Sequence, residues 1–268
     1  MTTDHQVLPG QSVSLAEIPT RADSFADSRK QAEKECKKLR HELIELQNCL
    51  YADGNQKLLV VLQAMDAGGK DGTIRRVFRG VNPQGVRVTS FKRPSSNDLA
   101  HDFLWRIHKA VPGNGMIGVF NRSHYEDVLV VRVDEIVPEH IWRPRFEMIN
   151  QFEAMLAATG TRIVKFYLHI SRAEQKERFE ERLHIPEKNW KFDSGDLGKR
   201  EQWDDYRTAY EEVLTTCSTK VAPWHVIPSD QKWYRNLAIT RVLVNTLRDM
   251  DPRYPDQTED LSGITIPD

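Results

Sequence analysis

The amino-acid sequence predicts an α/β protein in three layers, with helices on both faces of a five-stranded parallel sheet and a helical lid. Five apolar runs have the length of buried strands, and helical patterns separate them along the chain. Strands that alternate with helices require right-handed crossover connections, which place the strands parallel to one another. A chain of 268 residues without internal repeats is long enough for one such body.

The expected strands are short and apolar. They lie at residues 58–62, 85–91, 115–120, 161–170 and 222–227. The expected helices show apolar residues at helical spacing. They lie at residues 28–51, 73–80, 99–110, 138–158, 171–183, 204–217 and 233–250. The segment 128–133 is apolar and short, and it is assigned to neither class.

Local signals predict where several helices begin and end. Ser28 and Ser171 are N-cap candidates, and Asn97 or Asp98 is the candidate for the third helix. Gly160 is expected to end the helix before the fourth strand. Side chains and glycines of this kind satisfy the free backbone groups at helix ends, so they indicate the boundaries.

The composition favours a cytoplasmic protein that binds neither nucleic acid nor membranes. With 38 basic and 39 acidic residues the net charge is −1, so the chain has no bulk attraction for polyanions. The three cysteines are odd in number and lack metal-ligand spacing, which fits reduced thiols. We expect no signal peptide, because the first residues lack an apolar region, and no apolar run reaches the roughly twenty residues of a membrane helix.

The chain is expected to divide into an arm, a domain and a tail, at residues 1–27, 28–250 and 251–268. Within the domain, the segment 186–203 has Trp190 between two lysines, two glycines and no long apolar period. Such a stretch is a poor core element and a good lid. The lid is therefore expected at about residues 178–205.

The most informative stretch is residues 57–76, in which a strand, a glycine-rich loop and a helix follow one another. Glycines let backbone N–H groups turn toward an anion, a helix N-terminus adds partial positive charge, and Lys70 adds a full one. The Walker A pattern is incomplete, because Ala64 replaces its first glycine and Asp71 replaces its hydroxyl residue. An ordinary glycine-rich turn with Lys70 in solvent is the alternative. The residues expected to bind phosphate here are Gly68, Gly69, Lys70, Asp71, Gly72 and Thr73.

Two carboxylates in this loop indicate a divalent cation. Asp66 and Asp71 would repel phosphate groups unless a cation lay between them, and the expected ion is Mg²⁺, with Mn²⁺ as the alternative. The third strand ends at Asn121, where phosphate-transferring P-loop proteins usually have an aspartate that helps to hold the metal. We therefore expect Asp66 to carry most of the ligation, with Asn121 as a ligand or bound through water.

Further charged residues directly follow two of the strands. The carboxyl ends of parallel strands face one crevice, so Lys92, Arg93 and Arg122 are expected near the same ligand as Lys70. The planar guanidinium of Arg122 suits phosphoryl oxygens, because it donates two hydrogen bonds at once. Solvent exposure is the alternative for Lys92 and Arg93. Glu126 is a ligand contact or a helix cap.

Three other polar residues in these segments have structural alternatives. His124 is expected to be packed or hydrogen-bonded, because phosphoryl transfer requires positioning and charge neutralisation more than a base. Asp127 is expected to cap the following helix. Arg178 either faces the ligand or pairs with Glu174, four residues earlier on the same helix.

In order and spacing, these segments resemble the polyphosphate kinase 2 family of P-loop kinases. The resemblance covers about residues 29–250 and is carried by LLVVLQAMDAGGKDGTIRRVF, FNRSHYEDVLVVRV, RLHIPEKNWKFDSGD and APWHVIPSDQKW. It implies a thymidylate-kinase-like fold with a helical lid. It also implies a homo-oligomer, a dimer or a tetramer, that transfers phosphoryl groups reversibly, with Mg²⁺, between inorganic polyphosphate and adenine or guanine nucleotides.

The resemblance also implies roles for individual residues. Asp66 and Lys70 match the essential loop residues, and Asn121 with Arg122 matches the second acidic motif, in which aspartate is more usual. Glu126 is similar to the corresponding residue of the class III group, which phosphorylates both AMP and ADP. Arg178 is expected to act with Asp66, Lys70 and Arg122 in catalysis. The lid residues that match positions facing the phosphate chain are Arg178, Arg182, Lys188 and Lys191.

Two other functions fit the same residues. An ATP-dependent nucleoside monophosphate kinase could use a similar loop, because a fold by itself does not decide function. The incomplete Walker A pattern and Asn121 also fit a regulator that binds nucleotide or polyphosphate without turnover. Activity with ATP but not with polyphosphate would favour the first, and thermal stabilisation by ligand without product would favour the second.

Overall fold

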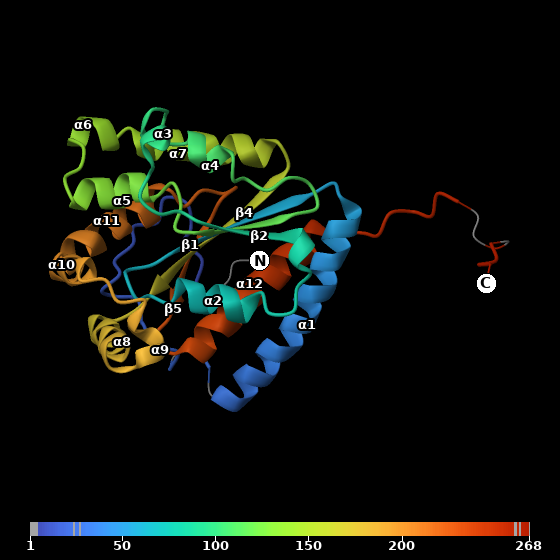
Figure 1. The fold of residues 1–268 in the computed structure, drawn as a ribbon, viewed down its shortest axis with the longest axis horizontal. Coiled ribbons are helices and arrows are strands. Elements are labelled where there is room, and N and C mark those ends of the chain that lie inside the picture. Colours follow the sequence, from blue (N-terminus) through green and yellow to red (C-terminus); the bar gives the residue numbers. More distant parts are fainter. Residues whose placement is uncertain (1–4, 24, 27, 260–261, 263, 268) are drawn as a thin grey trace.

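Five parallel strands form the centre of the protein (Figure 1). The computed structural model describes residues 5–23, 25–26, 28–259, 262 and 264–267. The strands lie in the order β2-β3-β1-β4-β5, and every neighbouring pair is parallel. The predicted α/β class and five-stranded parallel sheet are confirmed. The strand bounds are Lys57–Gln63 (β1), Val86–Ser90 (β2), Ile117–Asn121 (β3), Thr161–His169 (β4) and Trp224–Pro228 (β5).

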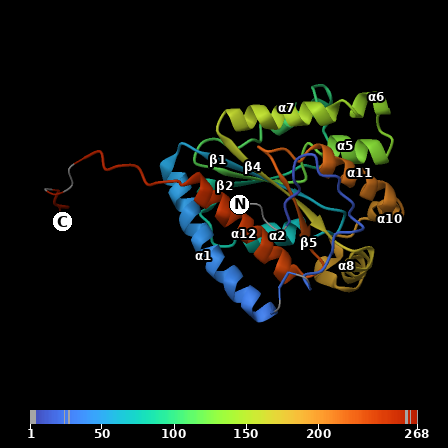
Figure 2. The ribbon, with the colours of Figure 1, turned by 180° about the vertical axis from the view of Figure 1, so that it is seen from behind.

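Helices cover both faces of the sheet and complete the three layers (Figures 1 and 2). One face packs against α1 (Arg29–Asp53), α2 (Lys70–Val77) and α12 (Lys232–Met250). The other packs against α5 (Glu126–Val133), α7 (Arg145–Ala158) and α11 (Trp203–Thr216). None of the helices in the described residues combines the length and apolar character needed to cross a membrane.

Strand β1 lies between the two helical layers and is apolar toward both. Leu58, Val60 and Leu62 face the layer of α1, α2 and α12, whereas Leu59 and Val61 face the opposite layer. All five side chains are fully buried. A continuous apolar run is expected for a parallel strand covered on both faces, and each such side chain stabilises the fold by about 1.5–3 kcal/mol.

Shorter helices connect these elements and form the segment that the sequence predicts to be a lid. The connecting helices are α3 (Ser96–Leu99), α4 (Trp105–His108) and α6 (Glu139–Trp142), with a 3₁₀ turn at Pro83–Gly85. The predicted lid, at about residues 178–205, contains the second half of α8 (Arg172–His184), α9 (Pro186–Asn189) and α10 (Gly195–Glu201), and we refer to this segment as the lid. Figure 1 shows this group of helices at one end of the sheet.

The single helix predicted at 99–110 is wrong, because the chain forms the short helices α3 and α4 there. Ser95, rather than Asn97 or Asp98, is the N-cap of α3. Its Oγ accepts the backbone N–H of Asp98 at 3.2 Å, and Asp98 Oδ2 accepts the backbone N–H of Ser95 at 2.9 Å. Between the two helices Asp102 Oδ1 accepts the backbone N–H two residues later at 3.0 Å. Side chains that bond the local backbone in this way compete with a continuous helix.

The helix predicted at 138–158 is divided into α6 and α7 at Pro144. Proline lacks a backbone N–H and its ring clashes with the preceding turn, so it ends one helix and begins the next. The apolar spacing of the predicted helix places Ile141 in the core, but in α6 the buried residue is Trp142, at 6% exposure, and Ile141 is 43% exposed. The apolar spacing therefore predicted helix correctly but not which residues of the first turn are buried.

Other helix boundaries follow the predicted signals in part. Ser28 and Ser171 accept backbone N–H groups at the starts of α1 and α8, and Gly160 lies just beyond α7 with a φ of +84°. These three predictions are confirmed. The unassigned segment 128–133 belongs to α5, and the predicted cap at Asp127 is wrong because α5 begins one residue earlier without a side-chain cap.

Residues 5–22 of the N-terminal arm pack on the body beside β5 (Figure 2). The backbone N–H of Val7 donates to the carbonyl O of Trp224, and that of Val226 to the carbonyl O of His5, both at 2.9 Å. Leu15, 2% exposed, lies in the same apolar cluster as α7 and α11. The arm thus covers a sheet edge that would otherwise present unpaired backbone groups.

Replacement of Leu15 by alanine should lower the free energy of unfolding by about 2–5 kcal/mol, because it leaves a cavity in the core. The matched control is Leu8→Ala, since Leu8 lies in the same arm and is 48% exposed. The control should change the free energy by less than about 0.5 kcal/mol. Equilibrium urea unfolding measures both, and equal small effects would show that the arm does not pack as described.

Candidate active site

The loop after β1 reaches α2 through a glycine in the left-handed region. Gly69 has a φ of +99° and directly precedes α2. The helix begins at Lys70, three residues before the predicted Thr73, because the backbone of Gly69 turns the chain without a side-chain cap. A Cβ at Gly69 would also lie 2.4 Å from Nη1 of Arg235. Both the φ angle and this close approach require glycine at the position.

Arg178 is bonded to the backbone of the loop and is not among the residues that line the cavity between the loop and the lid. Its side chain is 7% exposed and donates to the carbonyl oxygens of Ala67 at 3.0 Å and Ser229 at 2.7 Å. Its Nε donates to Glu174 Oε1 at 2.7 Å, so the pairing considered for these two residues is present. These bonds join the loop to β5 and α8.

Arg235 is a second buried arginine beneath the loop, which the sequence reasoning missed. It is 3% exposed, lies against Gly69 and donates to Asn236 Oδ1 at 3.0 Å. Burial, followed by the positive charge of Arg178, lowers the pKa of Arg235 to about 9. The sequence could have indicated this burial, because Arg235 lies three residues before Ala238 and therefore on the buried face of α12. A charge at such a position requires a partner or a ligand.

Lys70 lies at the start of α2 with its Nζ donating to the carbonyl O of Ala64 at 3.0 Å. Burial, followed by the nearby charge of Arg122, lowers the pKa of Lys70 to about 8. Thr73 is buried, and its Oγ1 donates to the carbonyl O of Gly69 at 3.0 Å. Lys70 is therefore a cation that would gain stability from an added negative charge, whereas Thr73 supports the helix.

A cavity of about 410 Å³ lies between the loop, the ends of β2 and β3, and the lid. The carboxyl ends of parallel strands meet at one edge, which explains why distant segments converge there. Asp193 and Asp196 of the lid also line the cavity. The predicted site residues in the lining are Asp66, Gly68, Gly69, Lys70, Asp71, Gly72, Lys92, Asn121, Arg122, Arg182 and Lys191.

Other predicted residues lie outside this lining. Arg93 is exposed, as the alternative for that residue proposed. Lys188 points to Glu181, with its Nζ 2.6 Å from Oε2. Glu126 lines a smaller adjoining cavity together with Asp66. Arg93, Lys188, Glu126, Arg178 and Thr73 are thus not brought into the main cavity.

Asp66 contacts Arg122, which follows β3, and Lys199 of the lid. Its Oδ1 accepts from Nη2 of Arg122 at 2.9 Å, and its Oδ2 lies 3.8 Å from Nζ of Lys199 in α10. The sequence reasoning missed Lys199, although it predicted the lid segment that contains it. The sequence indicated only that Lys199 lies in the lid segment. This segment has many charges of both signs, so nothing distinguishes one lysine from the others.

Asp71 has the same arrangement of partners. Its Oδ1 accepts from Nδ2 of Asn121 at 2.7 Å, and its Oδ2 lies 3.8 Å from Nζ of Lys191 in the lid. Arg182 also faces the cavity, with its Nη1 3.1 Å from Oδ2 of Asp196. Asp66 of the loop and Asp71 of α2 therefore each contact both a residue at or just after the end of β3 and a lysine of the lid.

The donor set fits a phosphate-bound divalent cation better than an all-protein metal cage. Among the described residues no group of three or more His, Cys, Asp or Glu side chains is arranged to hold a metal. Asp66, Asp71 and Asn121 nevertheless place side-chain oxygens around one cavity. Mg²⁺ prefers oxygen ligands and commonly binds through one or two protein groups, water and substrate phosphates.

Known proteins resemble this chain along most of its length, and residues 26–255 match the family model described as polyphosphate kinase 2. The AMP/ADP-polyphosphate phosphotransferase of Meiothermus ruber is 53% identical over 237 residues, covering 88% of this chain and 89% of the relative. The ADP-polyphosphate phosphotransferase of Rhodopseudomonas palustris is 44% identical over 269 residues, with 96% and 93% covered. The crystal structure of polyphosphate kinase 2 from Arthrobacter aurescens TC1 matches with a TM-score of 0.90 and 41% identity, covering 94% and 90% of the two chains. The chain therefore belongs to the polyphosphate kinase 2 family, as its motifs predicted.

Proposed function

We propose that this protein is a kinase that transfers phosphoryl groups reversibly between inorganic polyphosphate and adenine nucleotides. With polyphosphate as the donor, it would convert AMP to ADP and ADP to ATP. The observation that carries the proposal is the cavity in which Lys70 of the loop, Arg122 after β3 and Arg182 of the lid converge. Membership of the polyphosphate kinase 2 family supports it, as do the names of the relatives from Meiothermus ruber and Rhodopseudomonas palustris.

Phosphoryl transfer depends on positioning and on neutralising charge at the phosphoryl oxygens. Lys70 Nζ and the loop amides near Gly69 would bind these oxygens, and the guanidinium of Arg122 would donate two hydrogen bonds to them. In the protein alone, the carbonyl O of Ala64 and the carboxylate of Asp66 already hold these donors. Donors held in place before the reaction need little reorganisation in the transition state.

We assign a divalent cation, Mg²⁺ or alternatively Mn²⁺, to the side-chain oxygens of Asp66 and Asn121. When bound, the ion supplies positive charge to phosphate oxygens of the donor and acceptor. Asp66 also orients Arg122, since its Oδ1 accepts from Nη2 at 2.9 Å. Asn121 carries no charge, so the ion would depend on Asp66 and on the substrate phosphates for most of its negative ligands.

The lid would bind the polyphosphate chain and exclude water from the reacting group. Arg182 and Lys191 line the cavity, and Lys199 reaches Asp66 from α10. Exclusion of water favours transfer to the nucleotide over hydrolysis of the donor. Arg178 would act through the loop backbone that it holds, whereas Lys188 would reach the phosphate chain only after leaving Glu181.

The acceptor assignment rests on Glu126 and on the relative from Meiothermus ruber. Glu126 lines the small cavity next to Asp66 and Arg122, where an acceptor phosphate would lie close to both. We propose both AMP and ADP as acceptors, with guanine nucleotides as a second acceptor class. A homo-oligomer, a dimer or a tetramer, and a cytoplasmic location remain predictions from the sequence.

The protein incubated with polyphosphate, Mg²⁺ and either AMP or ADP is expected to form the next higher phosphate, read by chromatography. Lys70→Ala should lower the rate roughly 10²–10³-fold, because the transition state loses a preorganised charge. The matched control is Lys37→Ala, on the exposed face of α1, which should keep the wild-type rate.

The same assay separates the competing functions. Near-normal turnover of Lys70→Ala would contradict the role of the loop. Transfer from ATP to a monophosphate without transfer from polyphosphate would indicate a nucleoside monophosphate kinase. A ligand that raises the melting temperature without any product would indicate a regulator. Product from ADP but none from AMP would remove the proposed AMP activity.

The activity should fall as the pH rises above about 8. The pKa of Lys70 is lowered to about 8 by burial and by Arg122, so the free protein loses this cation above that pH. The pH profile of kcat/KM reports groups of the free enzyme, and its basic limb should therefore lie near pH 8. In Lys70→Arg, which stays charged, this limb should move to higher pH. An unchanged limb would exclude Lys70 as its source.

Lys199→Met should weaken polyphosphate binding and reduce its dependence on salt. Each cation that contacts a polyanion contributes roughly 0.7–0.9 to the slope of log affinity against log salt concentration. Loss of Lys199 should lower the slope of log KM for polyphosphate against log salt concentration by roughly 0.7–0.9. Lys176→Met is the matched control, because Lys176 lies on the exposed face of α8 beside Glu180. Equal slopes for both variants would place Lys199 outside the polyphosphate site.

A further inference from the structure

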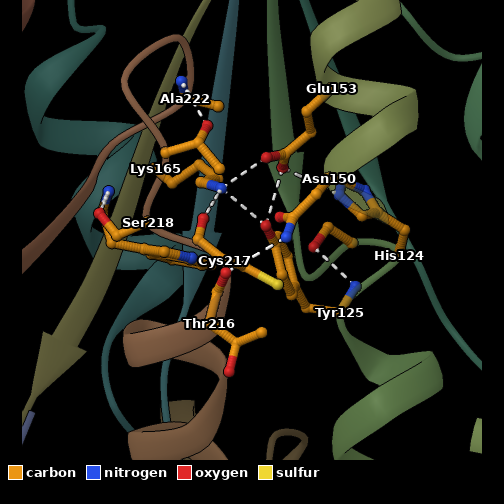
Figure 3. Close-up of polar contacts among 12 residues, drawn as sticks. His124, Tyr125, Asn150, Glu153, Lys165, Thr216, Cys217, Ser218 and Ala222 are labelled. Atoms are coloured by element: carbon orange, nitrogen blue, oxygen red, sulfur yellow. Dashed lines mark hydrogen bonds and ion pairs between the residues drawn. The ribbon is translucent and has the colours of Figure 1, made fainter. Parts of the chain in front are cut away.

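A buried group of charged and polar side chains begins two residues after Arg122 in the sequence, and Figure 3 shows its contacts. We call it the Lys165 cluster, and it consists of His124, Tyr125, Glu153 and Lys165. All four residues have a relative exposure of 0%. The cluster joins β4, α7 and the segment after β3, and it also contacts the carbonyl O of Cys217 at the end of α11. It contributes no residue to the lining of the main cavity.

Nearly every hydrogen-bonding group in the cluster has a partner. Lys165 Nζ donates to Tyr125 Oη at 2.7 Å, to Glu153 Oε2 at 2.6 Å and to the carbonyl O of Cys217 at 2.7 Å. Glu153 Oε1 accepts from Tyr125 Oη at 2.9 Å and lies 3.2 Å from His124 Nε2. A lysine ammonium has three donors, so Lys165 is fully satisfied. Such a network has one well-defined arrangement.

Stability alone does not account for this cluster. Burial by itself would raise the pKa of Glu153, but Lys165 and His124 reverse the effect and the pKa is lowered. The buried carboxylate therefore stays ionised opposite a buried ammonium. A buried ion pair is weak evidence for stability, because well-packed apolar side chains often stabilise as much or more. What the network adds is a single defined position for the chain that contains Tyr125.

That chain segment begins with a residue in an unusual backbone conformation. Arg122 has a φ of +61°, in the left-handed region that residues other than glycine rarely adopt. Such a conformation persists only where the surrounding structure holds it. On one side the backbone N–H of Arg122 donates to the carbonyl O of Leu62 at 3.1 Å. On the other side Ser123 Oγ accepts from Gln63 Nε2 at 3.2 Å, and the Lys165 cluster follows directly.

We propose that Tyr125, Glu153 and Lys165 are positioning residues for Arg122, acting by clamping residues 123–125 so that its guanidinium faces Asp66 before substrate binds. This inference rests on the proposed phosphoryl transfer. Tyr125, Glu153 and Lys165 would support that reaction although none of them lines the main cavity. The geometry supports this direction of action, because the cluster is bonded to β4, α7 and the end of α11, whereas Ser123 alone separates Arg122 from the cluster. Residues behind a catalytic group matter for the rate, because a small displacement of a group such as the Arg122 guanidinium lowers the rate strongly.

The test uses Tyr125→Phe, which removes one hydroxyl and leaves the Glu153–Lys165 pair intact. We expect kcat for transfer from polyphosphate to ADP to fall by about tenfold, because Arg122 is less well placed in the transition state. KM for ADP and for polyphosphate should change by less than about twofold, since most binding groups are untouched. The matched control is Leu43→Val, a buried change in α1 on the opposite face of the sheet, which should lower Tm without changing kcat.

A double-mutant cycle separates positioning from a general loss of stability. If Tyr125 acts through Arg122, Tyr125→Phe should have almost no further effect on kcat in the Arg122→Ala background. A merely structural role would lower kcat by the same factor in both backgrounds, and that result would overturn the inference. Unchanged kcat in the single Tyr125→Phe variant would overturn it as well.

A crystal structure of Tyr125→Phe gives a readout that does not depend on activity. The Arg122 Nη2 to Asp66 Oδ1 distance, 2.9 Å in the wild type, should lengthen beyond hydrogen-bonding distance or become variable among copies. An unchanged distance would overturn the positioning role. A wild-type protein that transfers no phosphoryl group would overturn the proposed function, and the crystal structure would still decide whether the cluster positions Arg122.

Discussion

The ion pair between Asp66 and Arg122 is the contact on which the site depends. It joins the glycine loop after β1 to the segment after β3, with 2.9 Å between Oδ1 and Nη2. The two strands are parallel neighbours, so their carboxyl ends lie side by side at one edge of the sheet. The sheet brings the two segments together, and the ion pair sets how a carboxylate and a guanidinium face the same cavity.

The cavity beside this pair brings basic side chains together with the carboxylates of Asp66, Asp71, Asp193 and Asp196. Lys70, Arg122, Arg182 and Lys191 line one cavity, and the pKa of Lys70 is lowered as a result of burial and of Arg122. Asp66 lies 2.9 Å from Arg122, and Asp71 lies 3.8 Å from Lys191. A phosphate chain would add negative charge beside Lys70, so its binding and the protonation of Lys70 would be linked.

Gly69 and Arg122 are two of the positions at the site with a left-handed backbone, and buried charged residues lie next to each of them. Gly69, with a φ of +99°, lies against Arg235, and the loop before it is bonded to Arg178. Arg122, with a φ of +61°, is followed by the Lys165 cluster. Buried charges are costly unless they are paired, and here their partners are the backbone and side chains beside the site. Both sets of buried charges therefore support loop geometry that local sequence preferences would not maintain.

The sequence by itself determined the parallel strands, the glycine loop, the caps at Ser28 and Ser171, and the family, because these depend on local periodicity, backbone preference and motif order. Pro144 also carries a local signal for the division of α6 from α7, which the predicted single helix overlooked. The sequence did not determine the packing of the arm. Only the tertiary structure placed Lys199 beside Asp66 and Arg235 beneath the loop. It alone also gathered the Lys165 cluster from three separate segments. The reason is physical: a charged side chain carries no local sign of its partner, which lies across the fold and is chosen by burial and distance.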